Sequence, residues 1–330
     1  MTRRQFLSST LGAAVARAAV SSGMGIAGPS FSVFRAKDAI DYLEHCRALG
    51  AGGIQTGITS TDPSFLADLR GRAEKYGMYI EAIGGLRGEP ERVEAAVKAA
   101  KQAGALCMRC AMLGGRRYET FDSLEQWKKF AADSHVVIER AIPIFERHKL
   151  PLAVENHKDW TVDEFVEMIR RYGSDKLGVC LDTGNNIALL DDPMEVVERL
   201  APYAHSTHIK DMGVEEYPEG FLLSEVPLGD GLLDLPKIFA TLRKHRPAVK
   251  FSLEMITRDP LPVPCLTDKY WVTFPERNGR YLARMLTLAR QRRGARPLPR
   301  VEGLDRAARG RLEEENIKKC LAYSRDKLGV

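Results

Sequence analysis

The sequence predicts an α/β protein in which eight parallel strands, each followed by a helix, close into a (β/α)8 TIM barrel. Short apolar segments with strand character alternate with amphipathic helical segments over residues 24–291, eight of each. This alternation is typical of a parallel sheet, and such a sheet loses its unpaired edges only by closing. A doubly wound open sheet is the alternative, but no Gly-x-Gly-x-x-Gly motif follows the first strand.

The elements of the first half are marked by residues that start and stop helices. The first helix has the apolar spacing of an amphipathic helix and ends at Gly50. Asp62 stands where a helix N-cap belongs, and Pro63 occupies the first helical position of the second helix. We expect strands at 24–28, 52–58, 78–85 and 106–113, and helices at 36–50, 62–77, 89–104 and 123–149.

The second half repeats this pattern with four further strands and four further helices. A loop is expected between the seventh strand and its helix, over 212–233. We expect strands at 151–157, 177–185, 204–211 and 249–257, and helices at 161–173, 192–203, 234–245 and 277–291.

The N-terminal residues 1–22 have the composition of a twin-arginine export signal. Arg3 and Arg4 precede an Ala-, Ser- and Gly-rich stretch, and "ARA" at 16–18 matches a small-x-small cleavage site. The sequence therefore favours a periplasmic or otherwise exported protein, and a basic start on a cytoplasmic protein is the alternative. No run of 18 uninterrupted apolar residues occurs, so we expect no integral membrane segment.

Two further regions follow from the composition. Residues 23–291 form the predicted barrel, and 292–330 form a charged C-terminal extension that begins rich in Pro and Arg and continues as a helix. We expect this extension to pack on the barrel or on a second subunit, and the latter would make the protein a homo-oligomer. The net charge of +5 is too small to imply a nucleic-acid partner.

Four consecutive strands, the fifth to the eighth, each end in a residue that can bind a metal. In a barrel these ends meet at one mouth. Buried carboxylates without partners are costly, so three of them converging with an imidazole require a cation. We expect one divalent metal ion here, with Mn²⁺, Mg²⁺ or Co²⁺ favoured by the oxygen-rich set and Zn²⁺ acceptable. The ligands are Glu155 in "AVENH", Asp182 in "VCLDTGN", His208 in "HSTHIKD" and Glu254 in "FSLEM".

This ligand pattern, with "LGDGLLD" at 228–234, resembles the xylose isomerase-like TIM barrels, a group of sugar phosphate isomerases and epimerases. The resemblance covers about residues 24–290. It implies a metal-dependent isomerase or epimerase of carbohydrate metabolism that removes the proton α to a carbonyl of a keto-sugar or polyol. By position, Glu155 and Glu254 would be the catalytic bases as well as ligands.

Four further side chains are candidates for binding the substrate. His157 follows Glu155 by two residues, and Lys210 follows His208 by two, so each shares a strand face with a predicted ligand. Glu81 and Arg109, on the third and fourth strands, are also predicted to face the substrate. A core ion pair between Glu81 and Arg109 is the alternative for these two.

Other functions remain open on the same site. A lyase or dehydratase would use the same ligands to eliminate a leaving group. A metal-dependent hydrolase like endonuclease IV is disfavoured, because Asn185 stands where that enzyme usually has a histidine. Val214 occupies a position where ketose 3-epimerases typically carry an arginine, which argues against a simple free-ketose epimerase. A sugar-binding barrel without catalysis is a third interpretation.

Overall fold

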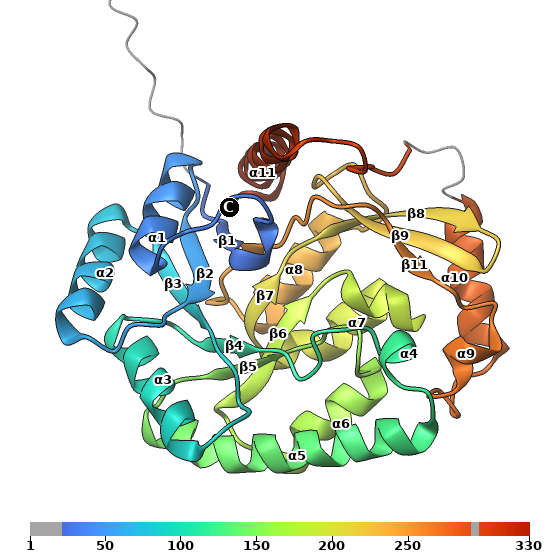
Figure 1. Cartoon of the computed structure of the whole chain (residues 1–330), viewed down its shortest axis with the longest axis horizontal. Helices are drawn as coiled ribbons and strands as arrows, with labels where there is room; N and C mark the ends of the chain where they lie inside the picture. The colour runs from blue at the N-terminus through green and yellow to red at the C-terminus, as the bar shows by residue number, and fades with distance from the viewer. Residues whose placement is uncertain (1–21, 292–296) are drawn as a thin grey trace, which may run out of the picture.

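The computed structural model describes residues 22–291 and 297–330, and its centre is a sheet of eight parallel strands (Figure 1). A bridge between Ile209 and Leu253 joins the two ends of the sheet, and the Ile209 N–H donates to the Ser252 carbonyl at 2.8 Å. The predicted TIM barrel is thereby confirmed, closed at a short seam. In sheet order the strands are β10 (Ser252–Leu253), β1 (Gly25–Ala27), β2 (Gly53–Gly57), β3 (Tyr79–Ile83), β4 (Met108–Cys110), β5 (Leu152–Glu155), β6 (Leu177–Asp182) and β7 (Ala204–His208).

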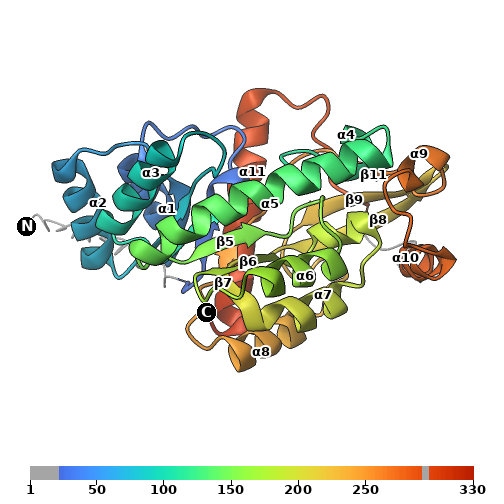
Figure 2. The same ribbon diagram turned by 90° about the horizontal axis from the view of Figure 1, so that it is seen from below.

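Helices surround the strands, and their ends follow the expected signals (Figures 1 and 2). Asp62 accepts a hydrogen bond from the Ser64 N–H at 3.1 Å and Pro63 is the first helical residue, as predicted. Thr161 and Glu164 form a reciprocal capping box after β5. The helices that follow the first seven strands are α1 (Ala39–Ala48), α2 (Pro63–Tyr76), α3 (Pro90–Gln102), α4 (Arg117–Thr120) with α5 (Leu124–Arg147), α6 (Val162–Tyr172), α7 (Pro193–Leu200) and α8 (Leu235–His245).

The segment after β7 differs from the expected loop. It forms an antiparallel hairpin of β8 (Asp211–Tyr217) and β9 (Gly220–Val226), and β11 (Leu261–Val263) adds a third strand to it. Figure 1 shows this small sheet beside the barrel. The prediction of a loop is wrong because β9 is stabilised by β11, a partner that lies far away in the sequence and that no local pattern reveals.

The two C-terminal helices also pack differently from the expectation. Helix α10 (Gly279–Gln291), predicted as the eighth barrel helix, packs on β8 and β9, close to α9 (Asp268–Trp271). Helix α11 (Arg306–Leu328) instead covers the barrel core with Ile317, Cys320 and Leu321. Its Glu313 accepts from the Ser32 hydroxyl at 2.8 Å, so α11 contacts the chain just after β1 as well as α8.

Among the described residues, no helix combines the length and apolar character needed to cross a bilayer. Nearly all of the predicted export signal, residues 1–21, lies outside the described part of the chain.

Candidate metal centre at the barrel mouth

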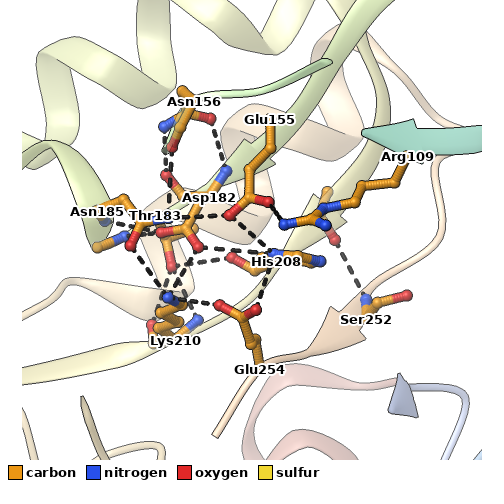
Figure 3. Close-up of polar contacts among 12 residues, drawn as sticks. Arg109, Glu155, Asn156, Asp182, Thr183, Asn185, His208, Lys210, Ser252 and Glu254 are labelled. Atoms are coloured by element: carbon orange, nitrogen blue, oxygen red, sulfur yellow. Dashed lines mark hydrogen bonds and ion pairs between the residues drawn. The ribbon is translucent and has the colours of Figure 1, made fainter. Parts of the chain in front are cut away.

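Four side chains from the last four barrel strands converge at the C-terminal end of the barrel (Figure 3). Glu155 and Asp182 are the last residues of β5 and β6, His208 is the last of β7, and Glu254 follows β10 directly. Each offers one ligand atom, and these atoms all lie within 4.8 Å of one another. Glu155, Asp182 and His208 are fully buried, and Glu254 is 3% exposed. The structure thus brings together the four ligands predicted from the sequence.

The imidazole of His208 is held with a lone pair facing the carboxylates. The Gln55 side-chain amide donates to the carboxyl of Glu81 at 2.9 Å, so its oxygen faces His208 Nε2 at 2.6 Å. Nε2 therefore carries the proton, and Nδ1 lies 3.4 Å from both Glu155 Oε1 and Glu254 Oε1. An outer hydrogen bond of this kind commonly fixes the tautomer of a metal-binding histidine.

Two buried atoms at the centre of the cluster lack hydrogen-bond partners among the described residues. They are His208 Nδ1 and Asp182 Oδ2. Lys210 Nζ lies 3.1 Å from Asp182 Oδ2, which is an ion-pair distance, but the contact lacks hydrogen-bond geometry. Buried polar atoms are normally satisfied, so an imidazole nitrogen and a carboxylate oxygen left open at one point fit a divalent cation. The cluster could therefore hold a metal ion.

The remaining carboxylate oxygens are bound by neighbouring groups that hold them in place. Asp182 Oδ1 accepts from the backbone N–H groups of Gly184 at 2.8 Å and Asn185 at 2.7 Å. The Asn185 side-chain amide donates to Glu155 Oε1 at 3.0 Å, and Arg109 pairs with Glu155 Oε2. Such outer contacts orient the ligands and limit how each carboxylate can approach an ion.

Two buried lysines flank the cluster. Lys210 Nζ lies 2.5 Å from Glu254 Oε2. Burial opposes its charge, but Asp182 and Glu254 raise the pKa of Lys210 above its usual value. Lys158 donates to Asn185 Oδ1, and burial followed by the nearby charge of Lys210 lowers the pKa of Lys158 to about 7. Lys210 was predicted from its strand position, whereas Lys158 was missed.

The other predicted substrate-binding residues differ in where they lie. Arg109 reaches the cluster through its ion pair with Glu155. His157 is half-buried, its Nδ1 has no hydrogen-bond partner among the described residues, and burial followed by Lys158 lowers its pKa. Its imidazole is therefore neutral near pH 7.

Glu81 lies below the cluster, away from the mouth. Its Oε2 accepts from the hydroxyl groups of Ser206 at 2.7 Å and Ser252 at 2.9 Å, which precede His208 and Glu254 by two residues along the chain. Neither the expected contact with substrate nor the alternative pair with Arg109 fits this position. Glu81 is at the centre of β3 and not at its end, and Arg109 pairs with Glu155.

A further charged residue comes from the hairpin that the sequence did not predict. Glu225 of β9 is 1% exposed, lies 3.6 Å from Lys210 Nζ, and accepts from the Arg258 guanidinium at 2.6 Å. The hairpin therefore adds a buried ion pair to the edge of the mouth. No signal in the sequence identifies Glu225, because its position depends on the pairing of β8 with β9.

Fold and site together define a parallel α/β barrel with a candidate divalent-metal centre at the C-terminal ends of its strands. The chain belongs to the family described as "Xylose isomerase-like TIM barrel", which matches residues 43–274. The resemblance expected from the ligand pattern is thereby confirmed.

Known proteins similar to this chain agree with that assignment. A 3-oxo-isoapionate decarboxylase from Pectobacterium atrosepticum is 28% identical over 209 residues, which cover 62% of this chain and 72% of the relative. A xylose isomerase-like TIM barrel protein from Mycobacterium smegmatis in complex with magnesium has a TM-score of 0.56 at 19% identity, covering 80% of this chain and 98% of that one.

Two other solved structures share the fold. A D-psicose 3-epimerase structure determined in the presence of D-fructose has a TM-score of 0.61 at 15% identity and covers 93% of this chain and 99% of that one. The IOLI protein with a zinc atom has a TM-score of 0.54 at 18% identity, covering 81% of this chain and 95% of that one.

Proposed function

We propose that this protein is a metal-dependent isomerase or epimerase that removes the proton α to the carbonyl of a keto-sugar or polyol. The observation that carries the proposal is the buried cluster of three carboxylates and one imidazole, with His208 Nδ1 and Asp182 Oδ2 left open at its centre. The similarity to an epimerase structure and to an enzyme acting on a 3-oxo sugar acid supports a sugar-type substrate.

One divalent ion would be held by Glu155, Asp182, His208 and Glu254. An oxygen-rich set with one imidazole favours Mn²⁺, Mg²⁺ or Co²⁺ and accepts Zn²⁺. When bound, the ion supplies a Lewis acid that polarises a substrate carbonyl. The side chains do the rest, because they fix the position of the ligands, exclude bulk water from a buried centre and accept the proton.

Glu155 and Glu254 are the proposed proton-transfer groups. Each carboxylate has a cationic partner, Arg109 for Glu155 and Lys210 for Glu254. Although burial opposes the charge of Glu254, His208 and Lys210 hold its pKa below the usual range, so this carboxylate is ionised and able to accept a proton. Two bases at one carbon permit epimerisation, and one base that serves a single face permits isomerisation.

A lyase acting on the same class of substrate is the second candidate. It is favoured by the similarity to a decarboxylase, whose name indicates a 3-oxo acid as substrate. Loss of a leaving group next to the carbonyl would use the same ligands. Hydrolysis of the endonuclease IV type has no such support, because Asn185 binds Glu155 and both lysines and offers no imidazole.

We also propose that residues 1–22 direct export by the twin-arginine route, which would place the barrel in the periplasm. The paired Arg3 and Arg4 before the Ala-rich segment are the support. Fractionation of cells that express the chain with Arg3 and Arg4 replaced by Lys tests this, and unchanged distribution between compartments would contradict it.

Deuterium exchange tests the proposed chemistry. The purified chain, loaded with Mn²⁺, is incubated in D₂O with keto-sugars and 3-oxo sugar acids, and deuterium at the carbon α to the carbonyl is followed by NMR. We expect exchange by the wild type and a loss of at least about 100-fold in Glu155→Gln and Glu254→Gln, as for removal of a general base. The matched control Glu139→Gln removes an exposed glutamate from α5.

Metal binding by the same variants separates the two roles of each glutamate. A variant that retains Mn²⁺ but loses exchange has lost a base, whereas one that loses both has lost a ligand. Exchange at the wild-type rate in either variant would contradict the assignment of that residue. Absence of exchange with every substrate tried would contradict the proposed function.

A further inference from the structure

Lys158 is a buried cation without an acidic partner. The residue is 3% exposed, and its ammonium group donates to the amide oxygen of Asn185. Among the described residues, no carboxylate oxygen lies within the 4.0 Å ion-pair distance of Lys158. Lys210, the other buried lysine of the described chain, has Asp182, Glu225 and Glu254 within that distance.

The charges around the mouth leave a positive excess, to which Lys158 contributes, once a divalent ion is bound. Four carboxylates and four cationic side chains face one another there, so their formal charges cancel. A divalent ion then leaves an excess of two positive charges. The carboxylates are Glu155, Asp182, Glu225 and Glu254, and the cations are Arg109, Lys158, Lys210 and Arg258.

A buried ammonium that is bound only to an amide is unfavourable by itself. Desolvation of a charged group costs several kcal/mol unless an opposite charge is close. Burial accordingly lowers the pKa of Lys158 to about 7, so that part of the population is neutral near that pH. A neutral polar residue could bind Asn185 without this cost. The position therefore fits an anionic ligand that arrives with the substrate and restores the charge of the lysine.

We propose that the substrate is a keto-sugar acid whose carboxylate is bound by Lys158. This inference rests on the proposed function and specifies its substrate class. One carboxylate supplies one negative charge, which matches the single buried ammonium group of the described chain that lacks an acidic partner. A phosphate dianion would need more than one free cation, whereas Arg109, Lys210 and Arg258 are already paired with carboxylates of the protein, so the geometry favours a carboxylate.

Binding of matched sugars to the Mn²⁺-loaded full chain tests the proposal. 5-Keto-D-gluconate has the carbon skeleton of L-sorbose, with a carboxylate in place of the terminal hydroxymethyl group far from the ketone. Fructose 6-phosphate carries a phosphate at the corresponding end. Isothermal titration calorimetry should show that the wild type binds 5-keto-D-gluconate at least about tenfold tighter than L-sorbose and tighter than fructose 6-phosphate.

Variants locate the effect at Lys158. Lys158→Met keeps the length and apolar stem of the side chain but removes the charge, and should bind the two matched sugars within about twofold of each other. Lys158→Arg should keep the preference. Lys129→Met removes an exposed lysine from α5 and should leave the preference unchanged. Mn²⁺ binding and near-ultraviolet circular dichroism confirm that each variant is folded.

The outcomes divide clearly. Equal affinity of the wild type for the sugar acid and the neutral sugar, including no measurable binding of either, would overturn the proposal, and this comparison does not depend on any variant. Tighter binding of fructose 6-phosphate than of 5-keto-D-gluconate would also overturn the proposal. A preference for the carboxylate that persists in Lys158→Met would overturn it as well. A carboxylate preference without deuterium exchange would leave charge recognition standing while the proposed chemistry fails.

Discussion

The barrel contains two layers of buried carboxyl groups that differ in their partners, which are neutral hydrogen-bond donors in one layer and cations in the other. In the lower layer, Glu81 accepts from Gln55, Ser206 and Ser252, all neutral donors, and burial raises its pKa. Among the described residues it has no cation within ion-pair distance. In the upper layer at the mouth, Glu254 is paired with Lys210, and although burial opposes ionisation, His208 and Lys210 hold its pKa below the usual range.

The difference shows that burial alone does not make a metal site. Glu81 is as deeply buried as Glu155, yet its position below the mouth gives it hydroxyl and amide partners and favours the protonated form. The upper layer pairs Glu155 and Glu254 with cations and leaves ligand atoms open. Gln55 joins the layers, since it binds Glu81 through its nitrogen and His208 through its oxygen.

Removal of one ligand from the upper layer should have the largest effect. Asp182→Asn keeps the oxygen that accepts from Gly184 and Asn185 but replaces the open oxygen with an amide nitrogen, which does not bind a cation. The wild type should gain about 2.7 kcal/mol in free energy of unfolding at a Mn²⁺ concentration 100 times its Kd. The variant should gain almost none, as measured by denaturant titration with and without Mn²⁺.

The matched control for this prediction is Asp133→Asn, which alters an exposed aspartate of α5 that pairs with Lys129. It should show the full stabilisation by Mn²⁺. Equal stabilisation of the wild type and Asp182→Asn would show that the ion binds elsewhere and would remove the contrast between the two layers.

The raised pKa of Glu81, in the lower layer, should make the free energy of unfolding depend on pH. Because the folded pKa of Glu81 is raised, the folded state binds more protons than the unfolded state above about pH 4.5. This group's contribution to stability is therefore complete at low pH and is lost as the pH rises, by at most about 1.4 kcal/mol per pH unit over the raised range. Glu81→Gln, a neutral isostere, should lose this slope.

Denaturant titration of the metal-free protein between pH 5 and pH 8 measures the effect. The wild type and Glu81→Gln should have similar stability at pH 5, and the variant should become the more stable of the two toward pH 8. Parallel curves for the two proteins would show that Glu81 is ionised in the folded state, like Glu254 at the mouth.

The upper layer could be predicted from the sequence because its residues are placed by local signals. Glu155, Asp182, His208 and Glu254 each end an apolar run, and closure of the barrel brings strand ends together whatever the details of packing. The sequence predicted Glu81 to face the substrate because the expected strand, 78–85, did not show at which residue the strand ends. The observed strand is centred on Glu81, and this puts the side chain one layer lower.

The features that were missed depend on non-local contacts. Lys158 follows β5 in a turn whose course is set by the capping box of α6 and by the bond from the Arg117 N–H to the Lys158 carbonyl. Its direction could not be inferred from strand alternation. In the same way, α10 follows the eighth strand in sequence, but it packs on the apolar face of the hairpin. Helix α11 covers the barrel core instead.

The smallest expected effect concerns His157, at the outer edge of the upper layer. It is half-buried and neutral, and within the described part of the chain its side chain makes no hydrogen bond to a ligand of the predicted ion. Loss of one neutral hydrogen bond to substrate costs about 0.5–1.5 kcal/mol, so His157→Ala should lower kcat/KM for deuterium exchange by about 2–10-fold and leave the Kd for Mn²⁺ unchanged. His148→Ala, which alters a histidine paired with Glu94 far from the mouth, is the control. A loss as large as that of Glu254→Gln would instead make His157 a proton-transfer group, and the reactive part of the upper layer would then extend to its rim.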